Sequence, residues 1–445
     1  MNKAVKIPDA RSVALDVVTK VWDEGAYANI ALNTELAKCE MPPIERHFVT
    51  ELSYGAVKAG EVLDMILKKF ITRPFKKIPP RIINILRLGI YQIFFLERIP
   101  DSAVCNEAVK LSRKYAHEGT AKFVNAVLRN AVRFKSDPGI GSDKELEQAV
   151  KLQHPSWLIE QWTNQIGYEN TKKLCLINNN NAPVCLRTNM LKTTPEALAN
   201  ILADEGVELE KSKWTEEGFV CKSFSSIAQS ESFKKGFFQV QDESSMLVAH
   251  YLDAKAGQFV IDVCAAPGGK TTHIAEIMNN NGTIIATDIY EHKLALIEDN
   301  AQRLGINIIK TFSHDATVSN NEWLEKADRV LVDAPCSGLG VLRRRPDLRW
   351  RKAQNDMKIF PPLQLSILEN AARYLKKDGK LVYSTCTTME EENIGVIKKF
   401  LLKNSDFEIF DMPHPLTGDK AGWLQLWPHV DGTDGFFICV LKRKL

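Results

Sequence analysis

The first third of the chain carries its apolar residues at helical spacing. Between residues 10 and 133 they recur every three or four positions, as at Val13, Val17 and Val21, and this period places them on one face of a helix. Proline ends helices because it lacks a backbone donor and clashes with the preceding turn, and prolines interrupt the pattern at residues 42–43, 74, 79–80 and 100. We therefore expect a compact all-helical domain over residues 1–140, with about five to seven helices.

The pattern changes from residue 237 onward. Short apolar runs now alternate with helical segments, which is typical of a parallel, doubly wound sheet covered by helices. The runs that predict strands are residues 259–263, 283–287, 306–311, 329–332, 380–384 and 436–441. We expect residues 237–445 to form one α/β domain of Rossmann-like topology.

The middle of the chain has a weaker pattern. Residues 136–142 combine glycine, proline and serine, a composition typical of a linker. Beyond them we expect a strand at residues 182–187 among helices at 157–166, 171–177 and 195–205. This mixture predicts a small α+β domain over residues 145–236.

Composition narrows the class of protein. The 445 residues are 44% hydrophobic and 25% charged, as in an ordinary soluble protein with room for two or three domains. Residues 1–12 lack the apolar run of a signal peptide, and the longest apolar segment, 82–96, is too short to span a membrane. The nine cysteines are scattered without a CxxC pair, so neither a zinc site nor a disulfide framework is indicated. We expect a cytoplasmic protein with free thiols, no metal and no membrane partner.

The net charge of +3 is unevenly distributed. Residues 1–135 hold 22 Lys and Arg against 14 Asp and Glu, whereas the remainder holds 36 against 41. A basic module joined to a mildly acidic one indicates that the first binds a polyanion such as nucleic acid. Charge alone leaves open a merely solvated helical surface.

A glycine turn follows the first predicted strand of the α/β region. The segment from Asp262 to Thr271 reads DVCAAPGGKT, and its glycines let backbone amides approach a ligand at the start of the next helix. Asp288 ends the second strand, where a carboxylate can bind a ribose diol. Asp315 follows the third strand, within reach of an adenine edge. These ordered acids favour S-adenosylmethionine as cofactor.

Other interpretations of this loop fit less well. A P-loop requires glycine five residues before Gly269, where this chain has Cys264. A nicotinamide site requires GxGxxG, which the loop lacks. A purely structural turn would explain Gly268 and Gly269 but not the acids after the next two strands.

Two cysteines follow the predicted strands four and five. Cys336 lies in the segment DAPCSG, and Cys386 lies in STCT. Because the carboxyl ends of parallel strands meet at one edge of a sheet, we expect both thiols to face the donor methyl group. Carbon 5 of cytosine becomes nucleophilic only after something adds to carbon 6, and a thiolate adds readily and later leaves. Asp333 stands where an acid can contact the ring nitrogen N3.

These motifs resemble the bacterial small-subunit ribosomal RNA cytosine-5 methyltransferases of the Sun/Fmu (RsmB) family. The resemblance covers essentially the whole chain and implies a NusB-like RNA-binding domain fused to an S-adenosylmethionine-dependent methyltransferase domain. Thr387 stands where the family commonly has serine, which concerns fine positioning rather than mechanism. The most specific matches are residues 264–270 and 333–338, Arg344-Arg345-Pro346-Asp347, Thr385-Cys386 and Glu391-Glu392-Asn393.

The resemblance also implies a role for each thiol. Cys386 would attack carbon 6 and Cys336 would help to release the product, whereas DNA cytosine-5 methyltransferases attack from the Pro-Cys thiol. Whether Lys270 also positions the target base stays open. The implied donor-binding residues are Cys264, Ala265, Ala266, Pro267, Gly268, Gly269, Lys270, Asp288, Asp315 and Asp333.

The expected substrate is an unpaired cytosine of 16S ribosomal RNA, because a paired base hides the face of carbon 6. We expect a monomer that acts on RNA not yet fully assembled into the subunit, and not on DNA. A basic-aromatic segment is predicted to contact phosphates and stack on a base, with a solvated loop as the alternative. It comprises Arg344, Arg345, Arg349 and Trp350.

Three other functions compete with this hypothesis. A transfer RNA or 23S RNA cytosine is possible, but the helical fusion favours 16S RNA. Methylation of a protein glutamine or an exocyclic amine usually uses Asn-Pro-Pro-Tyr after strand four, where this chain has Asp-Ala-Pro-Cys. A non-catalytic RNA-binding factor would need neither the cofactor loop nor the two thiols.

Overall fold

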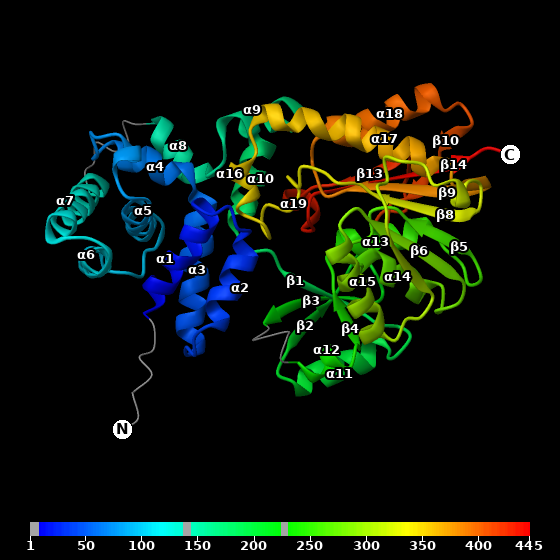
Figure 1. Ribbon diagram of the computed structural model, residues 1–445, viewed down its shortest axis with the longest axis horizontal. Coiled ribbons are helices and arrows are strands. Elements are labelled where there is room, and N and C mark those ends of the chain that lie inside the picture. The colour runs from blue at the N-terminus through cyan, green and yellow to red at the C-terminus, as the bar shows by residue number, and fades with distance from the viewer. Residues whose placement is uncertain (1–8, 137–143, 224–229) are drawn as a thin grey trace. The chain divides into compact units, whose positions relative to one another are not determined.

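The computed structural model describes residues 9–136, 144–223 and 230–445 (Figure 1). The chain divides into two compact units, one made of Met1–Asn180 with Leu342–Ala353, the other of Asn181–Val341 with Gln354–Leu445. Apart from Ser136, the predicted linker at 136–142 lies outside the described residues. Within the described ranges, the helices are all too short or too polar to cross a membrane.

Unit 1 is helical, as the sequence predicts for its N-terminal part. Pro43 and Pro80 stand at the first position of their helices, where the missing backbone N–H removes no hydrogen bond. The apolar faces of the helices meet in one core that includes Val17, Leu52 and Leu86. The helices are α1 (Ala10–Trp22), α2 (Ala28–Ala37), α3 (Pro43–Ala59), α4 (Glu61–Lys68), α5 (Pro80–Phe95), α6 (Asp101–Tyr115), α7 (Glu118–Lys135), α8 (Lys144–Leu152), α9 (Ser156–Ile166), α10 (Tyr168–Asn179) and α16 (Leu348–Arg351).

The unit boundaries differ from the predicted domain boundaries in two places. Helices α8 to α10 group with the N-terminal helices rather than with the strands that follow them, and Leu146 of α8 joins the core of the N-terminal helices. Residues 342–353 also group with unit 1, although the chain on either side of them belongs to unit 2. The side-chain contacts of this inserted segment explain why it groups with unit 1.

Arg349 anchors the inserted segment. Its side chain is 0% exposed, and its guanidinium donates to the carbonyl oxygens of Gln153 (2.8 Å) and Asn178 (3.0 Å) and to the Asn179 side chain (2.8 Å). The Trp350 indole donates to the Lys58 carbonyl at 2.9 Å. The prediction that Arg349 contacts RNA is therefore wrong, because every face of its guanidinium is buried in packing.

The Trp350 side chain also packs within unit 1, against Gly60. A Cβ built on Gly60 would lie 2.2 Å from the indole Nε1, so only glycine leaves room for this ring. The other two predicted RNA-contacting residues differ from this pair. Arg345 is exposed and lies 6.0 Å from the centroid of the Tyr27 ring, and Arg344 is partly exposed. Their role in RNA binding stays a prediction.

We expect Arg349→Met to lower the free energy of unfolding by about 2–4 kcal/mol, because it leaves several buried carbonyl groups without a donor. Urea unfolding of the full chain measures this change, and Arg345→Met is the matched control, with an expected change within about 0.5 kcal/mol. Lower RNA affinity of Arg349→Met at unchanged stability would contradict the packing role.

Unit 2 begins with a four-stranded antiparallel sheet in the order β2-β3-β1-β4. The sequence predicts its first strand and the helix α11, but not the other three strands, which are short. The apolar face of the sheet packs with α11 through Leu186, Leu198 and Phe238. The elements are β1 (Val184–Thr188), α11 (Pro195–Asp204), β2 (Glu208–Lys211), β3 (Gly218–Ser223), α12 (Glu231–Lys234) and β4 (Phe238–Val240).

The rest of unit 2 is built on an eight-stranded sheet in the order β10-β14-β9-β8-β5-β6-β7, with β13 paired to β14. The pairs among β5 to β9 are parallel, as predicted, whereas β14 runs antiparallel to β9. The strands are β5 (Phe259–Asp262), β6 (Thr283–Asp288), β7 (Ile309–Ser313), β8 (Ala327–Asp333), β9 (Leu375–Thr385), β10 (Phe407–Ile409), β13 (Trp423–Leu426) and β14 (Phe436–Arg443), and β11 (Met412–Pro413) and β12 (Lys420–Ala421) form a separate ribbon.

Helices cover both faces of this sheet (Figure 1). Val330 and Val332 of β8 pack in the core that contains α17 and α18, whereas Leu331 packs in the core that contains α13 and α14. Burial on both faces explains why the strand is continuously apolar rather than alternating. The helices are α13 (Glu243–Leu252), α14 (Gly269–Ile277), α15 (Glu291–Leu304), α17 (Phe360–Ala372), α18 (Ile394–Lys403) and α19 (Pro428–Asp431).

A buried ion pair joins the small sheet of unit 2 to helix α14. Arg187 of β1 pairs with Glu276 of α14 at 2.7 Å, and both side chains are almost fully buried. The same guanidinium donates to the carbonyl oxygen of Gly269 at 2.8 Å. Burial and the positive charge of Arg187 lower the pKa of the neighbouring His273 to about 3. The small sheet is thereby tied to the first turn of α14, where the glycine turn ends.

Candidate active site

The parallel strands of unit 2 bring the predicted site residues to one edge. Strands β5, β6 and β8 end at Asp262, Asp288 and Asp333, and β9 ends at Thr385. Parallel strands place their carboxyl ends on the same side of the sheet. The loops that carry the glycine turn and both cysteines therefore start from this edge.

The glycine turn forms the beginning of α14. Gly268 has φ +96°, a left-handed conformation that favours glycine, and a Cβ there would lie 3.1 Å from the Ile297 Cα. No side chain caps the helix, so its first N–H groups remain available to a polar ligand. The space in front of Gly269 is open, since a Cβ built there meets no atom within 4 Å.

The Asp262 side chain accepts hydrogen bonds from both ends of this turn. The Thr271 hydroxyl donates to Asp262 at 2.7 Å, and the Cys264 N–H donates to it at 3.4 Å. Burial raises the pKa of Asp262 to about 7. Burial also raises the pKa of Cys264 well above its usual range, together with the nearby carboxylates. The Cys264 thiol is therefore protonated, and it lines the loop rather than acting as a nucleophile.

Two further acids stand at the strand ends. Asp288 accepts the N–H of Tyr290 at 3.0 Å and lies 3.8 Å from the Lys293 ammonium. Asp315 accepts the N–H and hydroxyl of Thr317 at 2.9 and 2.7 Å, and these bonds lower its pKa. Open space before a glycine turn, uncapped helix N–H groups and acidic side chains at the strand ends fit the carboxylate, ribose and adenine of S-adenosylmethionine.

The two cysteines of the predicted pair are in contact. The Sγ atoms of Cys336 and Cys386 lie 3.3 Å apart. The hydrogen bond with Cys386 and burial raise the pKa of the Cys336 thiol well above its usual range. At neutral pH Cys336 is therefore protonated, and it can donate its proton toward the Cys386 sulfur.

A lysine and a carboxylate border the thiol pair. The Lys270 ammonium contacts Asp333 at 2.7 Å, and Ser384 donates to the other oxygen of that carboxylate at 2.8 Å. Asp333 and negative charge on Cys386 are among the causes that raise the pKa of Lys270. Lys270 is therefore positively charged, and it favours a thiolate at Cys386.

A buried glutamate connects the loops after the two cysteines. Glu392 is 1% exposed, and it accepts the backbone N–H of Ser337 and the side-chain amide of Gln364, both at 2.9 Å. The Ser337 and Thr387 hydroxyls bond to each other at 2.8 Å, and Thr387 also donates to Glu392 at 3.4 Å. The acid thus holds the residue after Cys336 and the residue after Cys386 together.

The structure brings most of the sequence-predicted residues together. Cys264 to Lys270, Asp288, Asp315, Asp333, Cys336 and Cys386 all belong to unit 2 and to the loops at one edge of its large sheet. The predicted RNA-contacting residues belong to unit 1. Reasoning from the sequence missed Glu392 and Gln364 as supports, although Glu392 lies in a motif already noted. The Glu-Glu-Asn run shortly after the nucleophile motif is the sequence signal that could have indicated it.

We expect Asp288→Ala to weaken S-adenosylmethionine binding about tenfold or more, because a charged hydrogen-bond acceptor is worth ~1.5–3 kcal/mol. Isothermal titration of the purified protein with S-adenosylmethionine measures the change. Asp299→Ala, an exposed acid on α15, is the control and is expected to bind normally. Equal affinities of the two variants would remove Asp288 from the cofactor site.

The fold and the glycine turn define a methyltransferase, and comparisons with known families agree. Residues 249–442 match the family described as "16S rRNA methyltransferase RsmB/F". Residues 8–133 match the NusB family. Residues 154–228 match the "Methyltr_RsmF/B-like, ferredoxin-like domain". The three matches follow the order of the helical, small-sheet and large-sheet regions.

Similar proteins extend this agreement to the whole chain. "Probable ribosomal RNA small subunit methyltransferase B" of Bacillus subtilis is 40% identical over 99% of this chain and 100% of its own length. The crystal structure of PH0851 matches with a TM-score of 0.87 and 28% identity over 99% of this chain and 100% of its own. That of NSun6 from Pyrococcus horikoshii with SFG matches with a TM-score of 0.57 and 25% identity, over 65% and 98%.

The chain therefore belongs to the RsmB/F family of ribosomal RNA small subunit methyltransferases. Its cofactor is S-adenosylmethionine. The predictions of a NusB-like N-terminal domain and a methyltransferase C-terminal domain are confirmed. The small α+β domain is ferredoxin-like.

Proposed function

We propose that the protein methylates carbon 5 of a cytosine in 16S ribosomal RNA through a covalent adduct of Cys386 with carbon 6. The observation that carries this proposal is the contact of two thiols, 3.3 Å apart, on loops that leave the same sheet edge as the cofactor turn. Two thiols beside a methyl donor have no use in methylation of an oxygen or an amine. They suit a reaction in which one sulfur adds to the ring and the other assists elimination.

The proposed reaction balances without any further reagent. The Cys386 thiolate forms a bond to carbon 6, and the double bond between carbons 5 and 6 shifts to carbons 4 and 5. N3 takes a proton through the Asp333 carboxyl group, and carbon 5 becomes nucleophilic. Bound S-adenosylmethionine supplies an electrophilic methyl group, which carbon 5 takes. Carbon 5 then loses its proton to a base, N3 returns its own, and the bond from sulfur to carbon 6 breaks. The thiolate and the aromatic ring are both restored.

The pKa of Cys336 supports its proposed role in product release. The largest cause of the raised pKa of Cys336 is the hydrogen bond with Cys386. Much of the rise in this pKa therefore depends on negative charge at the Cys386 sulfur. Once Cys386 is bonded to carbon, that charge is gone and the pKa of Cys336 falls. Cys336 can then lose its thiol proton to solvent, and its thiolate becomes available as the base for the proton on carbon 5, at the stage where elimination needs one.

Asp333 and Lys270 are the proposed partners of the target base. Asp333 is held by Lys270 at 2.7 Å and by Ser384 at 2.8 Å, so its carboxylate has a fixed orientation beside the thiols. We assign it the contact with N3. Lys270, through its positive charge, favours ionised Cys386 before addition.

The proposed substrate is a flipped or unpaired cytosine of 16S RNA before full assembly of the subunit, bound by a monomer. A basic surface on the NusB-like region is expected to contribute salt-sensitive contacts to the phosphates. Residues 1–140, 145–236 and 237–445 are the proposed functional domains. Cytoplasmic location is part of the same proposal.

Methyl transfer from labelled S-adenosylmethionine to purified RNA tests the proposal. Unmethylated 16S RNA is expected to gain label that elutes as 5-methylcytidine after digestion, whereas 23S and transfer RNA stay unlabelled. Label in another nucleoside would overturn the cytosine-5 chemistry, and label only in transfer RNA or 23S RNA would overturn the choice of substrate. Bisulfite mapping of the labelled RNA identifies the cytosine.

A further inference from the structure

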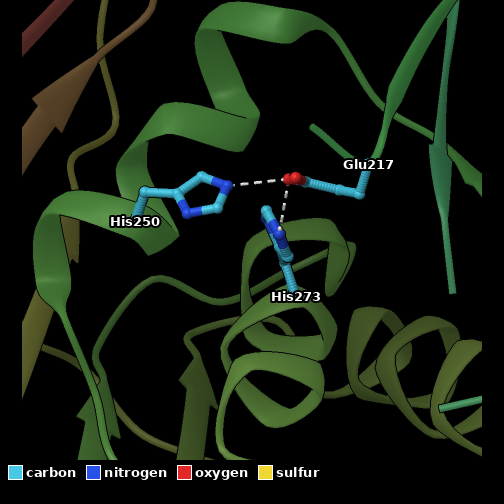
Figure 2. A group of neighbouring side chains, drawn as sticks. All are labelled: Glu217, His250 and His273. Carbon is cyan, nitrogen blue, oxygen red and sulfur yellow. Dashed lines mark hydrogen bonds and ion pairs between the residues drawn. The ribbon is translucent and has the colours of Figure 1, made fainter. Parts of the chain in front are cut away.

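Three side chains outside the methyl-transfer site converge in unit 2 (Figure 2). Glu217 lies in the turn just before β3, His250 on α13 and His273 on α14. They come from the small sheet and from two helices that cover the large sheet. The proposed reaction uses none of them.

The three donor atoms face one another. Nε2 of His250 lies 2.8 Å from Oε1 of Glu217, and Nε2 of His273 lies 3.1 Å from the same oxygen. The two rings are nearly perpendicular, with centroids 5.2 Å apart. The three donor atoms lie within 4.8 Å of one another. Figure 2 shows both imidazoles pointing a nitrogen at the carboxylate.

The burial of these side chains bears on the charge of the Glu217 carboxylate. The Glu217 and His273 side chains are 8% and 2% exposed, whereas His250 is 43% exposed. A buried carboxylate needs a positive partner. Among the residues that the structure describes, Glu217 forms ion pairs only with these two histidines. The guanidinium of the nearby Arg187 is instead paired with Glu276.

We propose that Glu217, His250 and His273 bind a divalent transition-metal ion, with Zn²⁺ as the best-suited metal. Imidazole nitrogens and a carboxylate oxygen suit zinc rather than calcium or magnesium. In a tetrahedral zinc site with ligands at ~2.0–2.2 Å, the ligand atoms lie about 3.3–3.5 Å apart. The distances from nitrogen to oxygen here need to widen by only a few tenths of an ångström. The exposed side of His250 leaves the fourth position to water.

The position of the site defines its role. His273 lies on α14, one turn after Gly269 and Lys270, and Glu217 borders the small sheet. A metal ion would therefore join the ferredoxin-like sheet to the helix that begins the cofactor loop, in parallel with the ion pair between Arg187 and Glu276. This arrangement points to a structural ion that stabilises unit 2 rather than to a catalytic one.

Metal binding to the full chain tests the proposal independently of methyl transfer. The thiols of Cys336 and Cys386 could bind zinc themselves, so the measurements use a Cys336→Ser/Cys386→Ser background. After treatment with a chelator and dialysis, the protein is titrated with Zn²⁺ by calorimetry and with Co²⁺ by visible absorption. We expect one equivalent to bind, with the absorption of tetrahedral Co²⁺ free of any thiolate band, and a higher thermal midpoint when Zn²⁺ is present.

Variants locate the ion. His250→Ala and Glu217→Gln are each expected to weaken Zn²⁺ binding at least about tenfold, whereas His292→Ala, which removes an exposed histidine on α15, leaves it unchanged. His250 is partly exposed, so its replacement is not expected to unfold the protein, and circular dichroism checks this. Failure of the background protein to bind one equivalent, or unchanged binding in His250→Ala, would overturn the proposal and leave a hydrogen-bonded cluster.

Discussion

Replacing Cys386 with alanine is expected to abolish methyl transfer, whereas replacing Cys336 with alanine is expected to trap the RNA on the protein. Loss of a covalent nucleophile costs on the order of 10⁴-fold or more in kcat. Without Cys336 the adduct still forms and the methyl group is still transferred, but the proton on carbon 5 has no nearby base. The enzyme then stops before elimination.

Denaturing gel electrophoresis with labelled 16S RNA separates the two outcomes. Cys336→Ala is expected to give a slowly migrating protein–RNA band that protease removes, and Cys386→Ala and the double variant are expected to give none. Cys39→Ala, far from the site in sequence and located in unit 1, is the control with normal turnover. An adduct that persisted in Cys386→Ala and vanished in Cys336→Ala would reverse the roles. No adduct in any variant would contradict the covalent mechanism.

Much of the site could be predicted because strand ends can be read from a sequence. Continuous apolar runs identify buried parallel strands, and the residues that follow such strands must share one edge of the sheet. This rule brings together Asp288, Asp333, Cys336 and Cys386 without any structural data. The choice of Cys386 as attacker rests on family resemblance, and it stays a proposal.

Tertiary packing determines the features that the sequence did not predict. Arg349 stands in a basic run that is typical of RNA contact, yet it is buried against backbone carbonyls of α10 and the turn after α8. Short strands such as β2 and β4 carry too few residues for a periodic signal. Glu217, His250 and His273 are too widely spaced for a metal motif, and only the fold brings them together. The sequence therefore indicated no metal site at all.

Replacing Glu392 with glutamine is expected to lower kcat about 10²-fold, because a displacement of ~1 Å at a reacting group can cost that much. Its carboxylate accepts hydrogen bonds from the Ser337 N–H and the Gln364 amide. Both donors bond to the same carboxylate oxygen, so an amide that keeps its oxygen there turns its NH₂ group toward the Thr387 hydroxyl, which donates to the other oxygen. That hydrogen bond is then lost, and the loops after Cys336 and Cys386 would separate. Burial raises the pKa of Glu392, and these hydrogen bonds oppose the rise.

Kinetics distinguish this positioning role from a merely stabilising one. Glu392→Gln is expected to keep the KM for RNA and the affinity for S-adenosylmethionine, because it touches neither, while adduct formation in the Cys336→Ala background slows in proportion to kcat. Glu391→Gln, which changes the exposed neighbouring acid, is the matched control and is expected to turn over normally. Activity of Glu392→Gln that recovers fully below the unfolding temperature would show that the acid only stabilises the fold. A proportional loss of kcat and adduct rate at full folding would show that it sets the distance between the thiols.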